Sequence, residues 1–166
     1  MIAVGDRMPE GIFRVKPDDG PVREISVSEL FAGQRVVLVG VPGAFTSTCH
    51  NAHVPQFVEN AAALRARGAD RIVVLAVNDA FVMKAWQQAL GALGKLDFMA
   101  DGDGEYARAL GLERTIPGMG RRLRRFSALI EDGVVKALNF EPEGARSISS
   151  TGAAMMLAQL SADAPA

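Results

Sequence analysis

The sequence predicts an α/β protein in which a mixed β-sheet lies between layers of helices. Two apolar runs rich in β-branched residues, at 35–41 and 71–77, are typical of strands that are buried on both faces. Each run is followed by a segment whose apolar residues have helical spacing, and an antiparallel hairpin and a last helix come later in the chain. This order of elements favours a three-layer sandwich, and we expect residues 1–166 to form a single domain.

The first part of the chain contains clear turn and capping signals. Residues 17–20, Pro-Asp-Asp-Gly, predict a hairpin loop. After the first buried strand, the hydroxyl residues at 46–48 can cap a helix. Pro55 lies inside this helical segment, and we expect it to kink the helix because proline lacks the backbone N–H. Gly68 is expected to end the segment.

The later elements follow from periodicity together with capping and turn residues. Asn78 or Asp79 can cap the helix after the second strand, and this helix is expected to bury an apolar stripe that includes Phe81 and Trp86. An Asp-Gly turn at 132–133 joins two strand-like runs and predicts a β-hairpin. The expected elements are a helix at 79–90, a strand at 96–101, a helix at 104–111, hairpin strands at 124–130 and 134–140, and a helix at 151–160.

Composition and charge narrow the classes of function. Hydrophobic residues make up 49% of the chain and charged residues 22%, which is ordinary for a globular domain. The net charge of −1 gives no reason to expect a nucleic acid or an anionic membrane as a partner. The segment RRLRR at 121–125 is a local exception. No apolar run approaches the ~18 residues that a membrane-spanning helix requires.

The N-terminus and the cysteine content bear on the compartment. The first residues lack the basic and apolar regions of a secretory signal. With one cysteine the chain cannot form an internal disulfide bond, and this fits a reducing compartment. We therefore expect a cytoplasmic protein.

The single cysteine, Cys49, lies in the first turn expected for the helix after the first buried strand. Backbone N–H groups and the positive end of the helix dipole meet there and favour a thiolate. A free thiol is only about 3% ionised at pH 7. Lowering its pKa by about two to three units requires roughly 3–4 kcal/mol of stabilisation of the thiolate relative to the thiol. Because a helix end supplies ~0.5–2 kcal/mol, the thiolate needs a cationic partner, and the arginines at 121–125 offer one.

The residues around Cys49 leave several interpretations open. A lone cysteine is commonly an inert core residue, whereas a position at a strand-to-helix turn beside hydroxyl groups supports a reactive role. The chain has no C-x-x-C motif for dithiol exchange. Cys49, His50 and His53 lack a fourth ligand, so we expect no metal site. A hydrolase-type pair of Cys49 and His53 has no identifiable orienting residue, and a His53 that hydrogen-bonds locally to hold the kinked helix is favoured.

Four blocks of the sequence resemble the peroxiredoxin family. Residues 42–49, PGAFTSTC, match the active-site signature P-x-x-x-T-x-x-C of that family. The likeness extends over essentially the whole chain. Three further blocks narrow it to the type II, peroxiredoxin-5-like subfamily: His53 with Pro55 and Phe57, AVNDAFVMKAW at 76–86, and RRLRRFSALIEDGVVKALNFEPEG at 121–144.

The resemblance implies a thioredoxin-like fold and a thiol-dependent peroxidase that reduces hydrogen peroxide and alkyl hydroperoxides. Cys49 would be the peroxidatic cysteine, which attacks a peroxide oxygen and becomes a sulfenic acid. Thr46 would hydrogen-bond the thiolate and the peroxide, and Pro42 would shield the sulfur from solvent. Arg125 would be the cation that polarises the peroxide. Strand alternation places Arg124 on the opposite face, and the neighbouring arginines are expected to be solvated or paired at the surface.

Many members of this family carry a second, resolving cysteine, and this chain has none. The resemblance therefore implies a one-Cys cycle without a cofactor, in which an external thiol reduces the sulfenic acid. Glutathione with glutaredoxin, or thioredoxin, is the expected reductant. Relatives commonly form dimers, so we expect a homodimer. A catalytically silent thioredoxin-fold interaction module is the alternative function, and a Cys–His hydrolase is a third.

Overall fold

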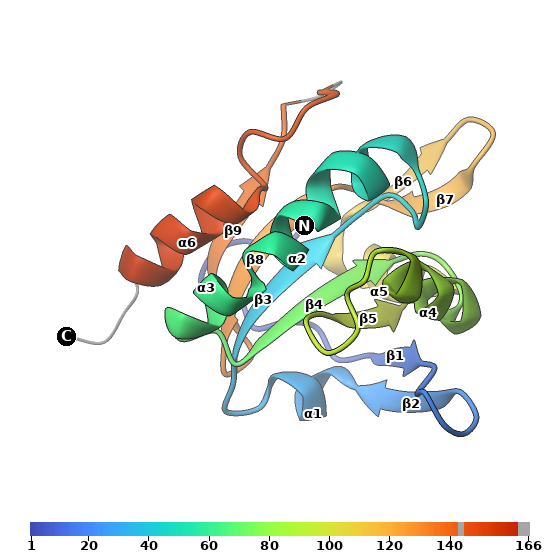
Figure 1. The fold of residues 1–166 in the computed structure, drawn as a ribbon, viewed down its shortest axis with the longest axis horizontal. Helices are drawn as coiled ribbons and strands as arrows, with labels where there is room; N and C mark the ends of the chain where they lie inside the picture. The colour runs from blue at the N-terminus through green and yellow to red at the C-terminus, as the bar shows by residue number, and fades with distance from the viewer. Residues whose placement is uncertain (143–144, 163–166) are drawn as a thin grey trace.

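A seven-stranded mixed β-sheet forms the centre of the fold (Figure 1). The computed structural model describes residues 1–142 and 145–162. Its strands lie in the order β2-β1-β5-β4-β3-β8-β9. Their bounds are Ile12–Val15 for β1, Arg23–Ser26 for β2, Arg35–Gly40 for β3, Arg71–Ala76 for β4, Asp97–Ala100 for β5, Phe126–Glu131 for β8 and Val134–Phe140 for β9.

Helices cover both faces of this sheet and complete the expected three-layer α/β sandwich. The helices predicted after β4, after β5 and after β9 are confirmed. The predicted hairpins are confirmed too, as the pairs β1–β2 and β8–β9. A short helix after β2 is an addition to the prediction. The helix bounds are Val27–Phe31 for α1, Val54–Glu59 for α2, Ala61–Ala66 for α3, Ala80–Ala89 for α4, Glu105–Leu110 for α5 and Ala153–Ala162 for α6.

The central strands β3, β4 and β5 are parallel, and their side chains fill two separate cores. Alternate residues of a strand point to opposite faces of the sheet. Val37 and Val39 of β3 pack with side chains of α2, α3, α4 and α6. Val36 and Leu38 of the same strand pack with side chains of α1 and α5. Burial on both faces is the reason why β3 and β4 are continuous apolar runs in the sequence.

The helical segment after β3 is more broken than the sequence predicts. It includes a π-helical turn, η1 (Cys49–His53), and the N–H of Val54 bonds to the carbonyl of Cys49. Pro55 follows in the first turn of α2, the helical position that tolerates proline best. The irregularity expected at Pro55 is therefore a change from π-helical to α-helical winding. A second break, at Asn60, separates α2 from α3.

The sequence pattern does not predict the separate two-stranded sheet formed by β6 (Glu113–Ile116) and β7 (Gly120–Leu123). Most of its residues are polar and at least partly exposed, so they lack the apolar alternation of a half-buried strand. Arg121 and Arg122 of the RRLRR segment belong to β7. The strand expected at 124–130 consequently begins later, at Phe126.

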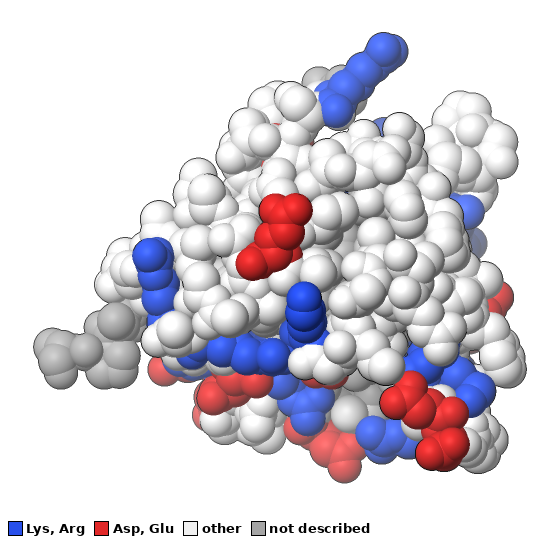
Figure 2. All heavy atoms as spheres, in the orientation of Figure 1, with Lys and Arg blue, Asp and Glu red and all other residues white. Residues whose placement is uncertain are grey.

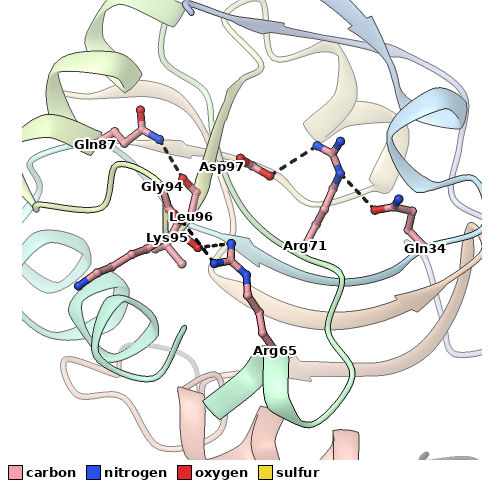
Figure 3. Close-up of polar contacts among 8 residues, drawn as sticks. All are labelled: Gln34, Arg65, Arg71, Gln87, Gly94, Lys95, Leu96 and Asp97. Carbon is pink, nitrogen blue, oxygen red and sulfur yellow. Dashed lines mark hydrogen bonds and ion pairs between the residues drawn. The ribbon is translucent and has the colours of Figure 1, made fainter. Parts of the chain in front are cut away.

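Polar side chains fix the loop between α4 and β5 at the amino-terminal end of the parallel strands (Figure 3). Arg65 of α3 donates hydrogen bonds to the main-chain oxygens of Lys95 at 2.7 Å and Gly94 at 3.4 Å. From the other side, the amide nitrogen of Gln87 donates to the main-chain oxygen of Leu96 at 2.8 Å. These contacts satisfy the main-chain carbonyls of a loop that has no regular secondary structure.

The helix α4 buries a different face from the one predicted. Trp86 is completely buried, but Phe81 is 65% exposed, so the prediction that one apolar stripe buries both is wrong. The other buried residues of α4 are Ala80, Met83 and Gln87. Figure 2 shows that few charged side chains lie over α2 and α4 in this view, and that most charges gather along the lower margin. Within the described ranges, no helix combines the length and apolarity needed to cross a membrane.

Candidate active site

Three segments of the chain meet at the carboxyl end of β3. Phe126, the first residue of β8, pairs with the last residue of β3 and also with the last residue of β9, because β8 is antiparallel to both strands. The loop that leads to Cys49, the residue Arg125 just before β8, and Glu141 just after β9 are therefore at the same end of the sheet. Sheet pairing thus brings together side chains that are far apart in the sequence.

The loop between β3 and η1 follows a fixed path to the cysteine. The hydroxyl of Thr46 donates to the carbonyl of Gly43 at 2.7 Å, and the N–H of His50 donates to the carbonyl of Thr46 at 2.8 Å. Phe45 has a left-handed backbone conformation with φ of +62°, which is strained for a residue with a side chain. Its ring stacks on the imidazole of His50 with 5.6 Å between the ring centres. Cys49 is the first residue of the π-helical turn that follows.

Arg125 is the cation that lies against the sulfur of Cys49. Cys49 is completely buried, and Nη2 of Arg125 donates a hydrogen bond to its sulfur at 3.1 Å. A guanidinium remains charged at every physiological pH. Away from water, its interaction with an anionic sulfur is stronger than between two exposed groups. The structure therefore confirms the expected contact between Cys49 and Arg125, with a guanidinium N–H directed at the sulfur.

His53 orients this arginine. Its Nδ1 lies 2.7 Å from Nη1 of Arg125, and its Nε2 lies 2.9 Å from the carbonyl oxygen of Thr151. A carbonyl can only accept and a guanidinium can only donate, so Nε2 carries the proton and Nδ1 is the acceptor. Burial and the charge of Arg125 lower the pKa of His53 to about 4, so the ring is neutral at pH 7. The expectation that His53 bonds locally within its helix is wrong, because both partners are distant in the sequence.

The carbonyl of Thr151 is itself held in place by a carboxylate. Glu141 accepts hydrogen bonds at 2.6–2.9 Å from the N–H groups of Ser149, Ser150 and Thr151 and from the hydroxyls of Ser149 and Thr151. Burial acts to raise the pKa of Glu141, but the hydrogen bonds from Ser149 and Thr151 outweigh it and hold the pKa at about 2. A chain of contacts therefore runs from Glu141 through Thr151, His53 and Arg125 to the sulfur. No motif in the sequence indicates Glu141 or Thr151, because they fix a loop and have no periodic spacing.

Thr46 and Pro42 lie in the loop that precedes the cysteine. The hydroxyl of Thr46 has one proton, and that proton is donated to Gly43. No bond from Thr46 to Cys49 occurs among the hydrogen bonds of the described residues, so Thr46 must release Gly43 before it can donate to the sulfur or to a peroxide. Pro42 lines a cavity that Arg125 also lines.

The remaining arginines of the RRLRR segment have separate environments. Arg121 forms an ion pair at the surface, as expected. Arg122 is not simply solvated, because its Nη1 donates to the carbonyl oxygen of Pro42 at 3.3 Å and so ties β7 to the active-site loop. The guanidinium of Arg124 lies over an aromatic ring at 4.0 Å.

The histidines near Cys49 have partners other than a metal. Trp86 donates its indole N–H to Nδ1 of His50 at 2.9 Å. Both ring nitrogens of His53 are in hydrogen bonds. Across the part of the chain that the structure describes, no three His, Cys, Asp or Glu side chains are grouped as metal ligands.

Comparison with known proteins places the chain in a family. It matches the family model described as Redoxin over residues 3–155. It is 47% identical over 156 residues to the chloroplastic peroxiredoxin-2E-2 of Oryza sativa subsp. japonica, which covers 90% of this chain and 69% of that protein. It is 44% identical over 151 residues to peroxiredoxin-2B of Arabidopsis thaliana, which covers 90% of this chain and 93% of that protein.

Solved structures agree with this likeness. Reduced Prx3 of Vibrio vulnificus in complex with hydrogen peroxide has a TM-score of 0.91 and 42% identity, covering 96% of this chain and 99% of that chain. Peroxiredoxin 5 of Alvinella pompejana has a TM-score of 0.83 and 28% identity, covering 96% and 98%. The thioredoxin-like fold is thereby confirmed, and together with a buried cysteine in contact with an arginine it defines a thiol-dependent peroxidase. The chain belongs to the peroxiredoxin family.

Proposed function

We propose that this peroxiredoxin is a type II, one-Cys enzyme that reduces hydrogen peroxide and alkyl hydroperoxides through a sulfenic acid at Cys49. The observation that carries the proposal is the 3.1 Å contact between Nη2 of Arg125 and the sulfur of Cys49, the chain's single cysteine. The type II assignment is supported by relatives that are named peroxiredoxin-2 or peroxiredoxin 5.

In the oxidative step, the thiolate of Cys49 attacks one oxygen of the peroxide. An S–O bond forms and the O–O bond breaks, so that the sulfur is oxidised to a sulfenic acid. The leaving oxygen takes up a proton and departs as water or an alcohol. Arg125 stabilises the negative charge as it moves from the sulfur to that oxygen. Thr46 donates its hydroxyl proton to the reacting atoms once it has released Gly43, and Pro42 limits access of solvent.

The reductive step needs thiols from outside, because the chain has no second cysteine. Glutathione attacks the sulfur of the sulfenic acid, an S–S bond forms, and water is released. A glutaredoxin thiol then removes the glutathionyl group and restores Cys49. No bound cofactor takes part. Thioredoxin is the alternative reductant.

The compartment and the oligomeric state complete the proposal. A single cysteine supports a cytoplasmic protein, because the sulfenic acid depends on reduced thiols in its surroundings. The weakly charged face over α2 and α4, together with Phe45, which is 50% exposed beside the active-site loop, supports a homodimer (Figure 2).

Intact-protein mass spectrometry after one equivalent of hydrogen peroxide tests this cycle. Without glutathione, the protein should gain the mass of one oxygen, and with glutathione it should gain one glutathionyl group. Cys49→Ser should gain neither. A Cys49–Cys49 disulfide that dominates under both conditions would contradict the one-Cys cycle. Turnover with glutathione and glutaredoxin, compared with thioredoxin, identifies the reductant.

A further inference from the structure

A cavity of about 660 Å³ opens beside the buried cysteine, and none of the steps above uses it. Its size falls in the range of ~300–1,000 Å³ that small-molecule sites occupy. Pro42 and Arg125 line the cavity, and so do Arg114 of β6 and Arg124, which lies between β7 and β8. Arg125 therefore links the two sites, because it lines the cavity and also contacts the sulfur of Cys49.

The acidic side chains that line this cavity already have partners. Glu113 pairs with Arg108 at 3.2 Å and with Arg121 at 3.5 Å. Glu141 lines the cavity too, but its carboxylate oxygens are occupied by the hydrogen bonds from residues 149–151. Glu113 is therefore shared between two arginines, whereas Glu141 keeps its negative charge but has its oxygens occupied by residues 149–151.

Two of the basic side chains, in contrast, have no acidic partner among the described residues. Within residues 1–142 and 145–162, Arg114 and Arg124 form no ion pair, and the guanidinium of Arg124 lies over the ring of Phe140 at 4.0 Å. With Arg125 they make three arginines against the two glutamates, Glu113 and Glu141, so the described lining of the cavity has a net positive charge. Guanidinium groups are suited to carboxylates, which they bind through paired N–H donors.

We infer that this cavity binds the carboxylates of the small thiol that reduces Cys49, and that its ligand class is a thiol peptide of the glutathione kind. The inference rests on the proposed one-Cys cycle, in which an external thiol must approach the sulfenic acid. Arg114 and Arg124 bind the carboxylates, while the thiolate of the ligand attacks the sulfur of Cys49. The S–S bond forms as the S–O bond breaks, so the ligand sulfur is oxidised and Cys49 is reduced. The hydroxide leaves as water after it takes up the proton that the ligand thiol lost on ionisation.

The first experiment measures binding to the reduced protein without any reaction. S-Methylglutathione keeps both carboxylates but has no free thiol. Titrated into the protein and followed by NMR, it should shift the backbone amides of residues 112–115 and 124–125. Arg114→Ala and Arg124→Gln should each weaken its binding by about tenfold, in line with the loss of a hydrogen bond to a charged group. Arg23→Ala, an exposed arginine of β2 at the opposite edge of the sheet, is the matched control and should bind like the wild type.

The second experiment measures the reductive step. The sulfenic acid is formed with one equivalent of peroxide and then mixed with either glutathione or 2-mercaptoethanol, which has no carboxylate. In Arg114→Ala and Arg124→Gln, the ratio of the glutathione rate to the 2-mercaptoethanol rate should fall by about tenfold, and in Arg23→Ala it should not change. An unchanged ratio in both cavity variants would overturn the inference, even if one of them were poorly folded.

The two experiments separate this inference from the proposed function. If Cys49 forms no sulfenic acid with peroxide, the proposed function fails, and the binding of S-methylglutathione still decides whether the cavity holds the ligand. If the sulfenic acid forms but S-methylglutathione shifts no amide of the cavity, or shifts it equally in all variants, the inference about the cavity is wrong and the peroxidase cycle stands.

Discussion

Arg65 and Arg125 are two arginines that donate hydrogen bonds at opposite ends of the parallel strands. At the amino-terminal end, Arg65 donates to the main-chain oxygens of Gly94 and Lys95 (Figure 3). At the carboxyl-terminal end, Arg125 donates to the sulfur of Cys49 and to an imidazole nitrogen. Each arginine donates through both of its terminal nitrogens, but the acceptors differ. A carbonyl never changes its charge, whereas a thiol can ionise and can be oxidised.

This difference shows that the acceptor gives each arginine its role. Arg65 is exposed and satisfies a loop, so the free energy of its contacts contributes to stability alone. Arg125 faces a buried sulfur, so the free energy of its contact depends on the charge of that sulfur and changes during a reaction. Substitutions at the two ends should therefore affect different measurements, and the following predictions test that separation.

The largest effect is expected at the acceptor itself. Cys49→Ser should reduce peroxide consumption to below a few per cent of the wild-type rate, because an alcohol is far less ionised than a thiol at neutral pH. The measurement is peroxide loss in the presence of glutathione and glutaredoxin. Since the chain has one cysteine, substantial residual activity would remove the thiolate from the mechanism altogether.

The next largest effect is expected at the donor. Arg125→Ala should slow the reaction of Cys49 with hydrogen peroxide by about 10²-fold, which is the usual cost of losing a transition-state donor. Stopped-flow measurement of the indole fluorescence gives the rate, because Trp86 bonds to His50 next to the cysteine. Arg65→Ala serves as the matched arginine control and should react at the wild-type rate. Equal effects of the two substitutions would show that general positive charge, and not the contact with sulfur, matters.

A smaller effect is expected from the histidine that orients Arg125. The pKa of His53 is lowered from 6.5 to about 4 by burial and by Arg125. The unfolded chain therefore binds more protons than the native protein between these two values, so stability is complete above pH 6.5 and is lost as the pH falls toward 4. Between pH 7 and pH 5 the loss should be about 2 kcal/mol in the free energy of unfolding.

Urea unfolding at the two pH values measures this loss, and His53→Gln provides the control. Glutamine does not titrate, so the difference between pH 7 and pH 5 should become much smaller in that variant. Glu141, with a pKa of about 2, loses its contribution only below its ordinary value of 4.5 and leaves this window largely unaffected. A pH dependence that is the same in His53→Gln would mean that another group is responsible.

Most of the fold could be predicted from the sequence because burial on both faces leaves a strong signal. The apolar runs of β3 and β4 and the turn at Asp132-Gly133 gave the correct strands. The small sheet of β6 and β7 was missed because polar, exposed strands have no apolar period. Phe81 was misplaced because its position on α4 fits an apolar stripe, although packing selected a different face of the helix.

The site was predictable only in part. The position of Cys49 and its need for a cation followed from charge and helix geometry, but the choice of Arg125 among its neighbours came from the family resemblance. The bond of His53 to Thr151, 98 residues away, joins η1 to the loop before α6, and no local pattern encodes it. Glu141 was missed for the same reason, because its partners lie in an irregular loop.

The smallest effect is expected at the amino-terminal end of the strands. Arg65→Ala removes two hydrogen bonds to the loop before β5, and water can satisfy the carbonyls of Gly94 and Lys95 that are left. The loss should therefore be about 1 kcal/mol in the free energy of unfolding, or about 2–4 °C in Tm for a chain of this size. Thermal unfolding followed by circular dichroism measures it, and Arg65→Lys should recover part of the loss because a lysine can still reach one carbonyl. If Arg65→Ala instead slowed the peroxide reaction while Tm stayed the same, the two ends of the sheet would be coupled, and an arginine's role could not be assigned from its acceptor alone.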